Sequence, residues 1–457
     1  MKRFLNLVVA VALSMSTAVF AQYDYLYEDM PFDMPKVNAP QIPQRSVSLD
    51  EFGAKGDGVT LCTDAFAKAI AELSRQGGGT LVVPQGVWYT GPIMLQSRIN
   101  LHLAAGAIVL FTEDYTKYPT VETIYEGKTA KKCQSPITAI DCEDVAITGS
   151  GVIDGNGMYW RPLKKPKTNS SQWDKITAFG GSIDEKGSLW TPDDNRQHLR
   201  PNLIKFVNCR RVMFKDVTFK NSPAWNVHPV MCQDIIVDGV KILNPSYAQN
   251  GDGIDIESCS RVIMVNSTLD VGDDGICIKS GKDEEGRRRG MPTEYVIVDG
   301  CTVYSAHGGF VIGSEMSGGA RNISVSNCQF IGTDNGLRFK STRGRGGVVE
   351  KIYIRNISMV DIPGSAILFN LYYGKKLKPG EVVEPIPVDE TTPSFRDISI
   401  ENLSCRGAKQ AFFFNGLPEM PVKNISLKNV SITADEKSTF NFCENITKEN
   451  VVETLLK

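Results

Sequence analysis

The stretch VIMVNSTLDVGDDGICIKS, residues 262–280, holds two runs of alternating apolar residues separated by Asn, Asp and Gly. Alternation with a period of two predicts β-strands, because successive side chains of a strand point to opposite faces. Asn266 interrupts the first run, and asparagine tolerates the left-handed backbone conformation that a sharp bend needs. The first eight residues therefore predict a strand, a bend and a second strand.

The eight-residue pattern VIMVNSTL recurs from residue 200 onward. Its copies begin at Val212, Ile235, Val262, Val296, Ile323, Ile352, Ile398 and Ile425, and most are 23 to 29 residues apart. The fifth residue of each copy is always Asp, Gly or Asn: Asp216, Gly239, Asn266, Gly300, Asn327, Asn356, Asn402 and Asn429. One bend per repeat of this length indicates stacked coils. The sequence therefore predicts an all-β protein, a parallel β-helix.

A second repeated pattern fixes how the coils align. It reads Gly, apolar, x, apolar, x, Ser in GIDIES (253–258), GICIKS (275–280), GFVIGS (309–314) and GLRFKS (336–341). Alternation sends the apolar residues inward and the residues between them outward. Aligning the four glycines makes Asp252 and Asp274 neighbours on adjacent coils. Asp273 then lies beside them and His307 one coil further on, with Lys279, Arg338 and Lys340 facing outward nearby.

The crowding of carboxylates indicates acid–base chemistry. Three carboxylates this close cannot all ionise freely, so at least one is expected to keep its proton near neutral pH. A protonated acid beside an ionised base is what the hydrolysis of a glycoside requires. The alternative is that each Asp-Gly pair only forms a turn, which does not explain why so many charged residues align on consecutive coils. No His/Cys cluster has metal-ligand spacing, so neither a metal nor a cofactor is expected.

The chain around the repeats divides into further parts. Lys2 and Arg3 precede an apolar stretch, so residues 1–21 are expected to be a signal peptide, and the protein to be exported, either periplasmic or secreted. Residues 22–45 resemble an extended arm, and a short helix near residues 62–76 is expected to cap the first coil. Residues 46–457 then form one catalytic domain, interrupted by insertions near 155–200, 281–291 and 373–393.

Charge and apolar content narrow the possible partners, and the cysteine positions indicate what those residues do. The formal net charge of −2 gives no general affinity for nucleic acid, and no stretch after the signal segment is apolar enough for a membrane anchor. Several of the eleven cysteines recur in register with the repeats, for example Cys209, Cys232 and Cys259. They are expected to be free thiols stacked in the core.

Four short motifs, in order, resemble those of the polygalacturonases, glycoside hydrolase family 28. The family's Asn-Thr-Asp, Gly-Asp-Asp, Gly-His-Gly and Arg-Ile-Lys correspond here to Asn250-Gly251-Asp252, Gly272-Asp273-Asp274, Ala306-His307-Gly308 and Arg338-Phe339-Lys340. The resemblance extends to EFGAKGDG, GGGTLVVPQG and GVIDGNG. The stretches IKSGKDEEGR, GGFVIGSEMSGG and FKSTRGRGG are most similar to bacterial exo-acting members.

The resemblance implies a right-handed β-helix that hydrolyses α-1,4-linked galacturonic acid in pectin, with inversion at the anomeric carbon. It implies that Asp273 is the general acid, that Asp252 and Asp274 hold the water, and that Arg338 and Lys340 bind the galacturonate carboxylate. Adjacent coils lie about 4.8 Å apart, which is closer to the separation of the two catalytic carboxyl groups in retaining enzymes than in inverting ones. The expectation of inversion therefore rests on the resemblance and not on this spacing. Asn250, Lys279 and His228 are expected to contact substrate, although His228 could instead pack against Trp225.

The insertions favour exo action, because a groove that selects chain ends must be closed on one side. Three of the five tryptophans lie in residues 155–200, and residues 281–291 add three arginines.

The alternatives to an exo-acting polygalacturonase are a galacturonidase on decorated or rhamnogalacturonan-type pectin, a calcium-dependent lyase of the pectate-lyase type, and a non-catalytic carbohydrate-binding solenoid. The expected partner is an acidic plant polysaccharide, and the sequence leaves the oligomeric state open.

Overall fold

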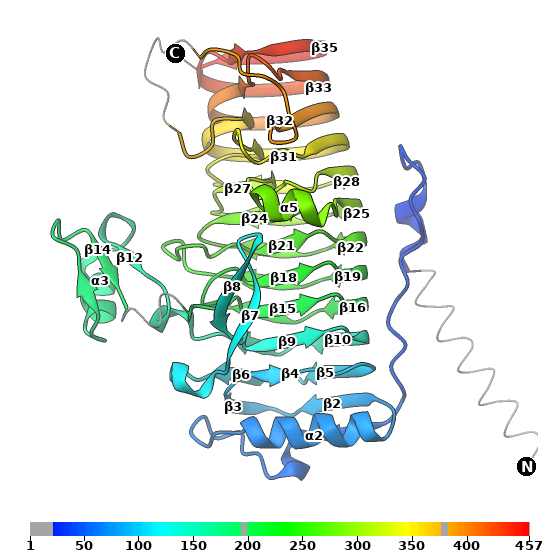
Figure 1. Cartoon of the computed structure of the whole chain (residues 1–457), viewed down its shortest axis with the longest axis vertical. Helices are drawn as coiled ribbons and strands as arrows, with labels where there is room; N and C mark the ends of the chain where they lie inside the picture. Colours follow the sequence, from blue (N-terminus) through cyan, green and yellow to red (C-terminus); the bar gives the residue numbers. More distant parts are fainter. Residues whose placement is uncertain (1–21, 193–198, 376–382, 457) are drawn as a thin grey trace, which may run out of the picture.

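The strands stack into a tall column of coils (Figure 1). The structure is a computed structural model that describes residues 22–192, 199–375 and 383–456. Each strand pairs in parallel with the equivalent strand of the next coil, which confirms the predicted parallel β-helix. The expected signal segment, residues 1–21, lies outside the described residues.

Each coil contributes a strand to each of three faces. The first, here called the site face, contains β4 (Ile93–Met94), β9 (Ile137–Ile140), β15 (Ile204–Val207), β18 (Val227–Val230), β21 (Ile254–Glu257), β24 (Asp274–Lys279), β27 (Gly308–Ile312) and β30 (Leu337–Lys340). The second, the arm face, contains β1 (Ser46–Ser48), β2 (Gly79–Val83), β5 (Ile99–Leu103), β10 (Glu143–Gly149), β16 (Arg210–Lys215), β19 (Gln233–Asp238), β22 (Ser260–Val265), β25 (Thr293–Asp299) and β28 (Ala320–Ser326). The third contains β3 (Gly86–Thr90), β6 (Ala107–Phe111), β11 (Val152–Asp154), β17 (Thr218–Lys220), β20 (Lys241–Leu243), β23 (Thr268–Asp270), β26 (Thr302–Tyr304) and β29 (Gln329–Ile331).

The last coils are formed by long strands that continue through the bends. They are β31 (Val348–Asn370), β32 (Ser394–Asn415) and β33 (Val422–Glu436), followed by β34 (Thr439–Asn441) and β35 (Cys443–Leu455). β31 pairs with β28, β29 and β30, so one strand spans all three faces.

Left-handed residues form the bends, as the repeats predicted. All eight fifth-position residues have φ between 52° and 65°. On the later coils their side chains also bond to one another, with Asn402 Nδ2 donating to Asn356 Oδ1 at 3.1 Å and Asn429 Nδ2 donating to Asn402 Oδ1 at 3.0 Å. The repeated residue therefore provides both the backbone bend and a ladder of amide hydrogen bonds.

The interior is filled by the inward-facing apolar residues in the predicted register. Ile254 pairs with Ile276, Ile276 with Phe310, and Phe310 with Leu337, and all four are fully buried. The eleven cysteines are free thiols, ten of them buried, which confirms that they are core residues rather than disulfides.

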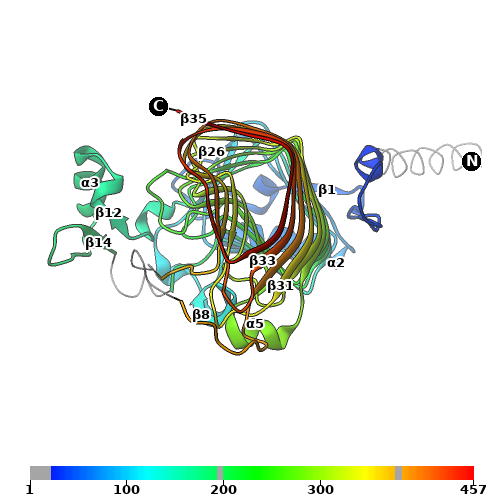
Figure 2. The same ribbon diagram turned by 90° about the horizontal axis from the view of Figure 1, so that it is seen from above.

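The N-terminal segment first follows the side of the column and then closes one end of it. Helix α2 (Thr63–Arg75) packs Phe66, Ile70 and Leu73 onto the first coils. The preceding arm contains a short 3₁₀ helix, Asp24–Tyr27, and lies on the arm face, where Tyr23 hydroxyl donates to Asp238 at 2.9 Å. Figure 2 shows the arm and the insertion that contains α3 (Ser170–Thr177) on opposite sides of the stack.

The three insertions have different structures. The described part of the first insertion before the gap at 193–198 contains a small antiparallel sheet, β12 (Leu163–Lys164), β14 (Leu189–Thr191) and β13 (Ser182–Ile183), with its own core that contains Trp173 and Trp190. Residues 281–291 form the short helix α5 (Asp283–Arg289). The third insertion is described only in part, because residues 376–382 lie outside the described ranges. None of the described helices is long and apolar enough to cross a membrane.

Candidate active site

A cavity of about 230 Å³ opens on the site face where the acidic and basic motifs meet. It is lined by Glu126, Trp225, Asn250, Asp252, Asp273, Asp274, Lys279, Lys282, Ser314, Glu315, Lys340, Arg345 and Tyr373. Arg338 borders it, because its guanidinium contacts both Asp274 and the ring of Tyr373. The stacked coils and the hairpin that carries Glu126 bring together residues from widely separated parts of the sequence.

The three aspartates converge at the floor of this cavity. One carboxylate oxygen from each of Asp252, Asp273 and Asp274 lies within 4.8 Å of the other two. Asp273 and Asp274 stand where β24 begins, and Asp252 lies just before β21 on the preceding coil. Adjacent strands of one sheet therefore place the trio at the same edge.

Asp274 is held in its ionised form by two cations. Arg338 contacts its Oδ1 at 2.8 Å and Lys340 contacts its Oδ2 at 2.5 Å. Burial acts to raise the pKa of Asp274, but Lys340 and Arg338 outweigh it and hold that pKa well below its usual range.

Asp273 is oriented through one of its two oxygens. Its Oδ1 accepts the Asp274 backbone N–H at 3.0 Å and lies 3.0 Å from His307 Nδ1. The other ring nitrogen, Nε2, lies 3.2 Å from the ammonium of Lys167 in the 155–200 insertion. Because an ammonium can only donate, Nε2 accepts and the His307 proton is on Nδ1, directed at Asp273. Burial is the largest single influence and raises the pKa of Asp273, but the hydrogen bond and charge of His307 together with the charge of Lys340 outweigh it, so this pKa lies below its ordinary value.

Asp252 differs from its two neighbours because it has neither the ion pairs of Asp274 nor the imidazole contact of Asp273. Its Oδ1 has no hydrogen-bond partner among the described residues, and its side chain is buried. Burial, and then the charge of Asp273, raise the pKa of Asp252 well above the ordinary value for aspartate. Of the three carboxyl groups, Asp252 is therefore the one that holds a proton most readily, and the crowding of carboxylates that the sequence indicated contributes to this.

The remaining predicted residues differ in their access to the cavity. Asn250 lines it and accepts a hydrogen bond from Arg200 at 2.8 Å. Lys279 also lines it, but its ammonium is paired with Glu315 at 2.8 Å. The prediction that His228 contacts substrate is corrected by the structure: its side chain is 0% exposed and lies behind the ring of Trp225.

Several lining residues escaped the sequence patterns because they lie outside the repeats. Glu126 is at the tip of a hairpin formed by β7 (Thr120–Tyr125) and β8 (Lys128–Cys133). Lys282 immediately precedes α5, and Tyr373 follows β31, with Lys340 Nζ 4.8 Å from its ring centre. The aromatic and charged composition of the insertions could have indicated Lys282 and Tyr373, whereas no sequence signal pointed to Glu126.

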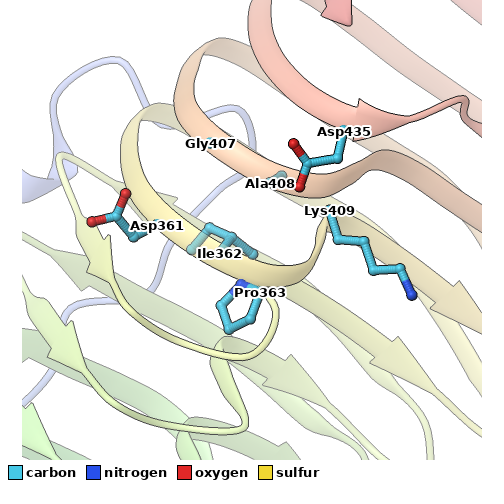
Figure 3. A pocket seen from close by; sticks show the side chains of 7 residues that line it. All are labelled: Asp361, Ile362, Pro363, Gly407, Ala408, Lys409 and Asp435. Carbon is cyan, nitrogen blue, oxygen red and sulfur yellow. The ribbon is translucent and has the colours of Figure 1, made fainter. Parts of the chain in front are cut away.

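A second cavity, of about 340 Å³, lies between the later coils and has a different character (Figure 3). It is lined by Asp361, Ile362, Pro363, Gly407, Ala408, Lys409 and Asp435. Its charged side chains are exposed, and Figure 3 shows Lys409 extending away from both carboxylates. It lacks the converging buried charges that an acid–base site requires, so the chemistry belongs to the first cavity.

Comparisons with known proteins identify relatives of the whole chain. The pattern described as Glycosyl hydrolases family 28 matches residues 169–452. A probable polygalacturonase of Vitis vinifera is 32% identical over 397 residues, covering 85% of this chain and 74% of its own. An exo-poly-alpha-D-galacturonosidase of Dickeya chrysanthemi is 25% identical over 435 residues, covering 89% and 71%. The crystal structure of a hyperthermoactive exopolygalacturonase from Thermotoga maritima superposes with a TM-score of 0.78 at 36% identity, covering 92% of this chain and 94% of its own.

Proposed function

The chain belongs to glycosyl hydrolases family 28, and from this premise we propose that it hydrolyses the α-1,4 linkages of galacturonic acid in pectin, releasing galacturonic acid from the non-reducing end. The substrate is polygalacturonate or its oligosaccharides. The protein works outside the cytoplasm, in the periplasm or after secretion, as residues 1–21 predict.

The observation that carries the proposal is the unequal environment of the three aspartates. Asp273 is the general acid: its Oδ1 is occupied by two hydrogen bonds, which leaves Oδ2 to carry the proton. Asp252 and Asp274 hold the water, since oxygens within 4.8 Å of each other can both reach one water molecule at about 2.8 Å. Arg338 and Lys340 bind the galacturonate carboxylate, for which the planar guanidinium offers two parallel donors.

Proton balance defines one turnover. Asp273 gives its proton to the glycosidic oxygen as that bond breaks, and the attacking water gives a proton to Asp252. The enzyme then holds its proton on Asp252, which is the arrangement that the free site favours. In the free site the Asp273 side chain is 22% exposed. When the next sugar binds and covers it, loss of water favours the neutral acid, so the proton moves from Asp252 back to Asp273.

Water held opposite the bond to be broken gives inversion at the anomeric carbon. Proton NMR of the first product anomer tests this assignment, and a retained configuration would reject it. His307 supports the acid by fixing Oδ1, while Asn250 and Lys279 line the sugar site.

Exo action is supported by the wall on one side of the cavity. This wall is formed by the hairpin, whose tip residue Glu126 lines the cavity, and by α5, whose preceding residue Lys282 also lines it. A time course on polygalacturonate tests the proposal, with viscosity and product sizes followed together. Galacturonic acid is expected as the main product from the first minutes, with slow loss of viscosity. An early ladder of mid-length oligomers would contradict exo action.

A lyase that uses calcium is the second candidate, because three carboxylates with oxygens within 4.8 Å of one another could bind a cation. Arg338 and Lys340 already neutralise Asp274, which favours hydrolysis. Chelator-sensitive activity and an unsaturated product absorbing in the ultraviolet would support the lyase.

Two further alternatives have their own tests. Sugars released from a panel of pectins would identify a preference for decorated or rhamnose-containing polymers. Binding without new reducing ends would indicate a non-catalytic solenoid.

A further inference from the structure

The wall beside the cavity consists of two elements joined at their tips. Glu285 in α5 accepts hydrogen bonds from the Thr129 backbone N–H at 2.9 Å and hydroxyl at 2.7 Å. Lys128 pairs with Asp283 at 2.7 Å. The backbone of Lys282 donates to Gly127 carbonyl at 3.1 Å. The hairpin and α5 are therefore joined by both side-chain and backbone contacts.

A chain of buried polar groups anchors this wall to the coils behind it. Lys205 in β15 donates to the Ile124 carbonyl of the hairpin and lies 2.8 Å from His228 Nδ1. His228 Nε2 lies 2.8 Å from Glu257, and the other oxygen of Glu257 contacts Arg289 of α5 at 2.6 Å. Starting from the hairpin, the chain thus crosses three coils and ends on α5. We call Lys205, His228, Glu257 and Arg289 the anchor relay.

The charges of the anchor relay are arranged so that each donor meets an acceptor. The Lys205 ammonium and the Asn202 amide both face His228 Nδ1, so the ring proton is on Nε2 and is donated to Glu257. Burial lowers the pKa of His228 to about 3, which keeps the ring neutral. Burial acts to raise the pKa of Glu257, but His228, Arg289 and Lys205 lower it to about 2. Glu257 is therefore ionised and paired at both oxygens.

Such a relay is a costly way to stabilise a fold. Buried ion pairs often contribute no more than the apolar residues that could replace them, because both charges lose their water. What an ion pair does supply is a defined geometry. The relay passes behind Trp225, whose ring packs edge-on against His228 and lines the cavity. It therefore fixes the wall and one side of the sugar site together.

We propose that the anchor relay positions the hairpin–α5 wall and thereby restricts cleavage to chain ends. This inference rests on the proposed exo action. With the relay intact, the wall blocks the groove beyond the terminal sugar. With the relay broken, the wall moves away and a polymer can pass through the groove and be cut internally. Lys205, Glu257 and Arg289 are positioning residues, and none of them has to contact the sugar.

The test compares Arg289→Met with Arg288→Met. Both remove one positive charge from α5, but Arg288 is exposed and lies outside the relay. For Arg289→Met we expect the viscosity lost per reducing end released to rise several-fold, with mid-length oligomers appearing early. Hydrogen exchange in residues 120–133 is expected to accelerate in the same variant. Arg288→Met should match the unmodified protein in both measurements.

Lys205→Met tests the relay from its other end, and is informative even if Arg289→Met does not fold. If both residues act through one relay, the double variant should show the effect of one substitution rather than the sum. An unchanged product pattern with unchanged exchange in either folded variant would overturn the inference. Early oligomers from the unmodified protein would instead reject exo action itself, so the two failures can be told apart.

Discussion

The coils that carry the candidate site and the coils that follow them share one register but present different side chains. Arg338 is followed in its column by Leu368 and then Phe413, and Lys340 by Asn370 and then Asn415. The inward residue between them hardly changes, since Phe339 stacks on Phe369 with ring centres 4.3 Å apart. The interior therefore fixes the pairing, and the outward positions remain free to acquire chemistry.

This comparison predicts that substitutions on the two sets of coils have separable effects. Changes at the site on the central coils should affect activity, whereas changes on the later coils should affect stability alone. Four experiments test that separation.

The largest effect is expected for Asp273→Asn, which keeps the size of the side chain but removes the transferable proton. Loss of a general acid typically reduces kcat about 10²–10⁴-fold, and binding of oligogalacturonate should persist in calorimetry. Asp361→Asn, in a bend of the later coils with φ of 55°, is the matched control and should retain full activity. Near-normal release of reducing ends by Asp273→Asn would show that Asp273 is not the general acid.

The next effect is expected for Lys340→Gln or Arg338→Gln. Each loses a charged hydrogen bond to the substrate carboxylate, and a loss of about 1.5–3 kcal/mol corresponds to roughly 10–150-fold in kcat/KM. Asn370→Gln changes the same column one coil later and should have little effect on kcat/KM. Equal losses in all three variants would show that the column acts structurally.

A smaller effect, on stability alone, is expected for Asn402→Ala. Alanine disfavours the φ of 55° by about 1–2 kcal/mol, and the substitution also removes two amide hydrogen bonds of the ladder. Chemical unfolding should show the loss while activity of the folded protein is unchanged. Asn402→Gly separates the two causes, because glycine tolerates the angle but cannot make the bonds.

The smallest effect on stability is expected for Asp252→Asn, and it has the opposite sign. The pKa of Asp252 is raised in the folded protein, so unfolding releases a proton above the ordinary aspartate pKa and stability falls as pH rises. Asparagine removes this penalty. We expect a gain near the lower end of the about 0.5–2 kcal/mol common for stabilising substitutions at pH 7. The gain should disappear toward pH 4, and activity should be lost. Equal stability at both pH values would contradict the raised pKa.

The parts of the molecule that the sequence predicted are those fixed by repetition. Strand alternation and the bend residues determine the register, and the register alone places Asp252, Asp273 and Asp274 together. The free cysteines follow from the same alignment, since residues in register with buried positions are themselves buried.

The parts that could not be predicted depend on contacts between distant, non-repeating segments. Nothing local to Lys167 indicates that it reaches His307, and nothing in the hairpin at 120–133 indicates that it docks on α5. His228 was assigned to the cleft because its coil lies next to that of Asp252. A column position does not show whether a large ring such as Trp225 covers the residue behind it.

The N-terminal arm has a consequence for the order of assembly. In a solenoid each coil normally depends only on its neighbours, so folding can spread from one coil to the next. The arm breaks this locality: Tyr23 binds Asp238, 215 residues later, and Phe32 packs near Tyr295 and Tyr353. Its binding surface does not exist until those coils have formed. The arm is made before these coils but is thus among the last segments to dock. Once docked, it ties several coils together, so that they must unravel jointly rather than one at a time.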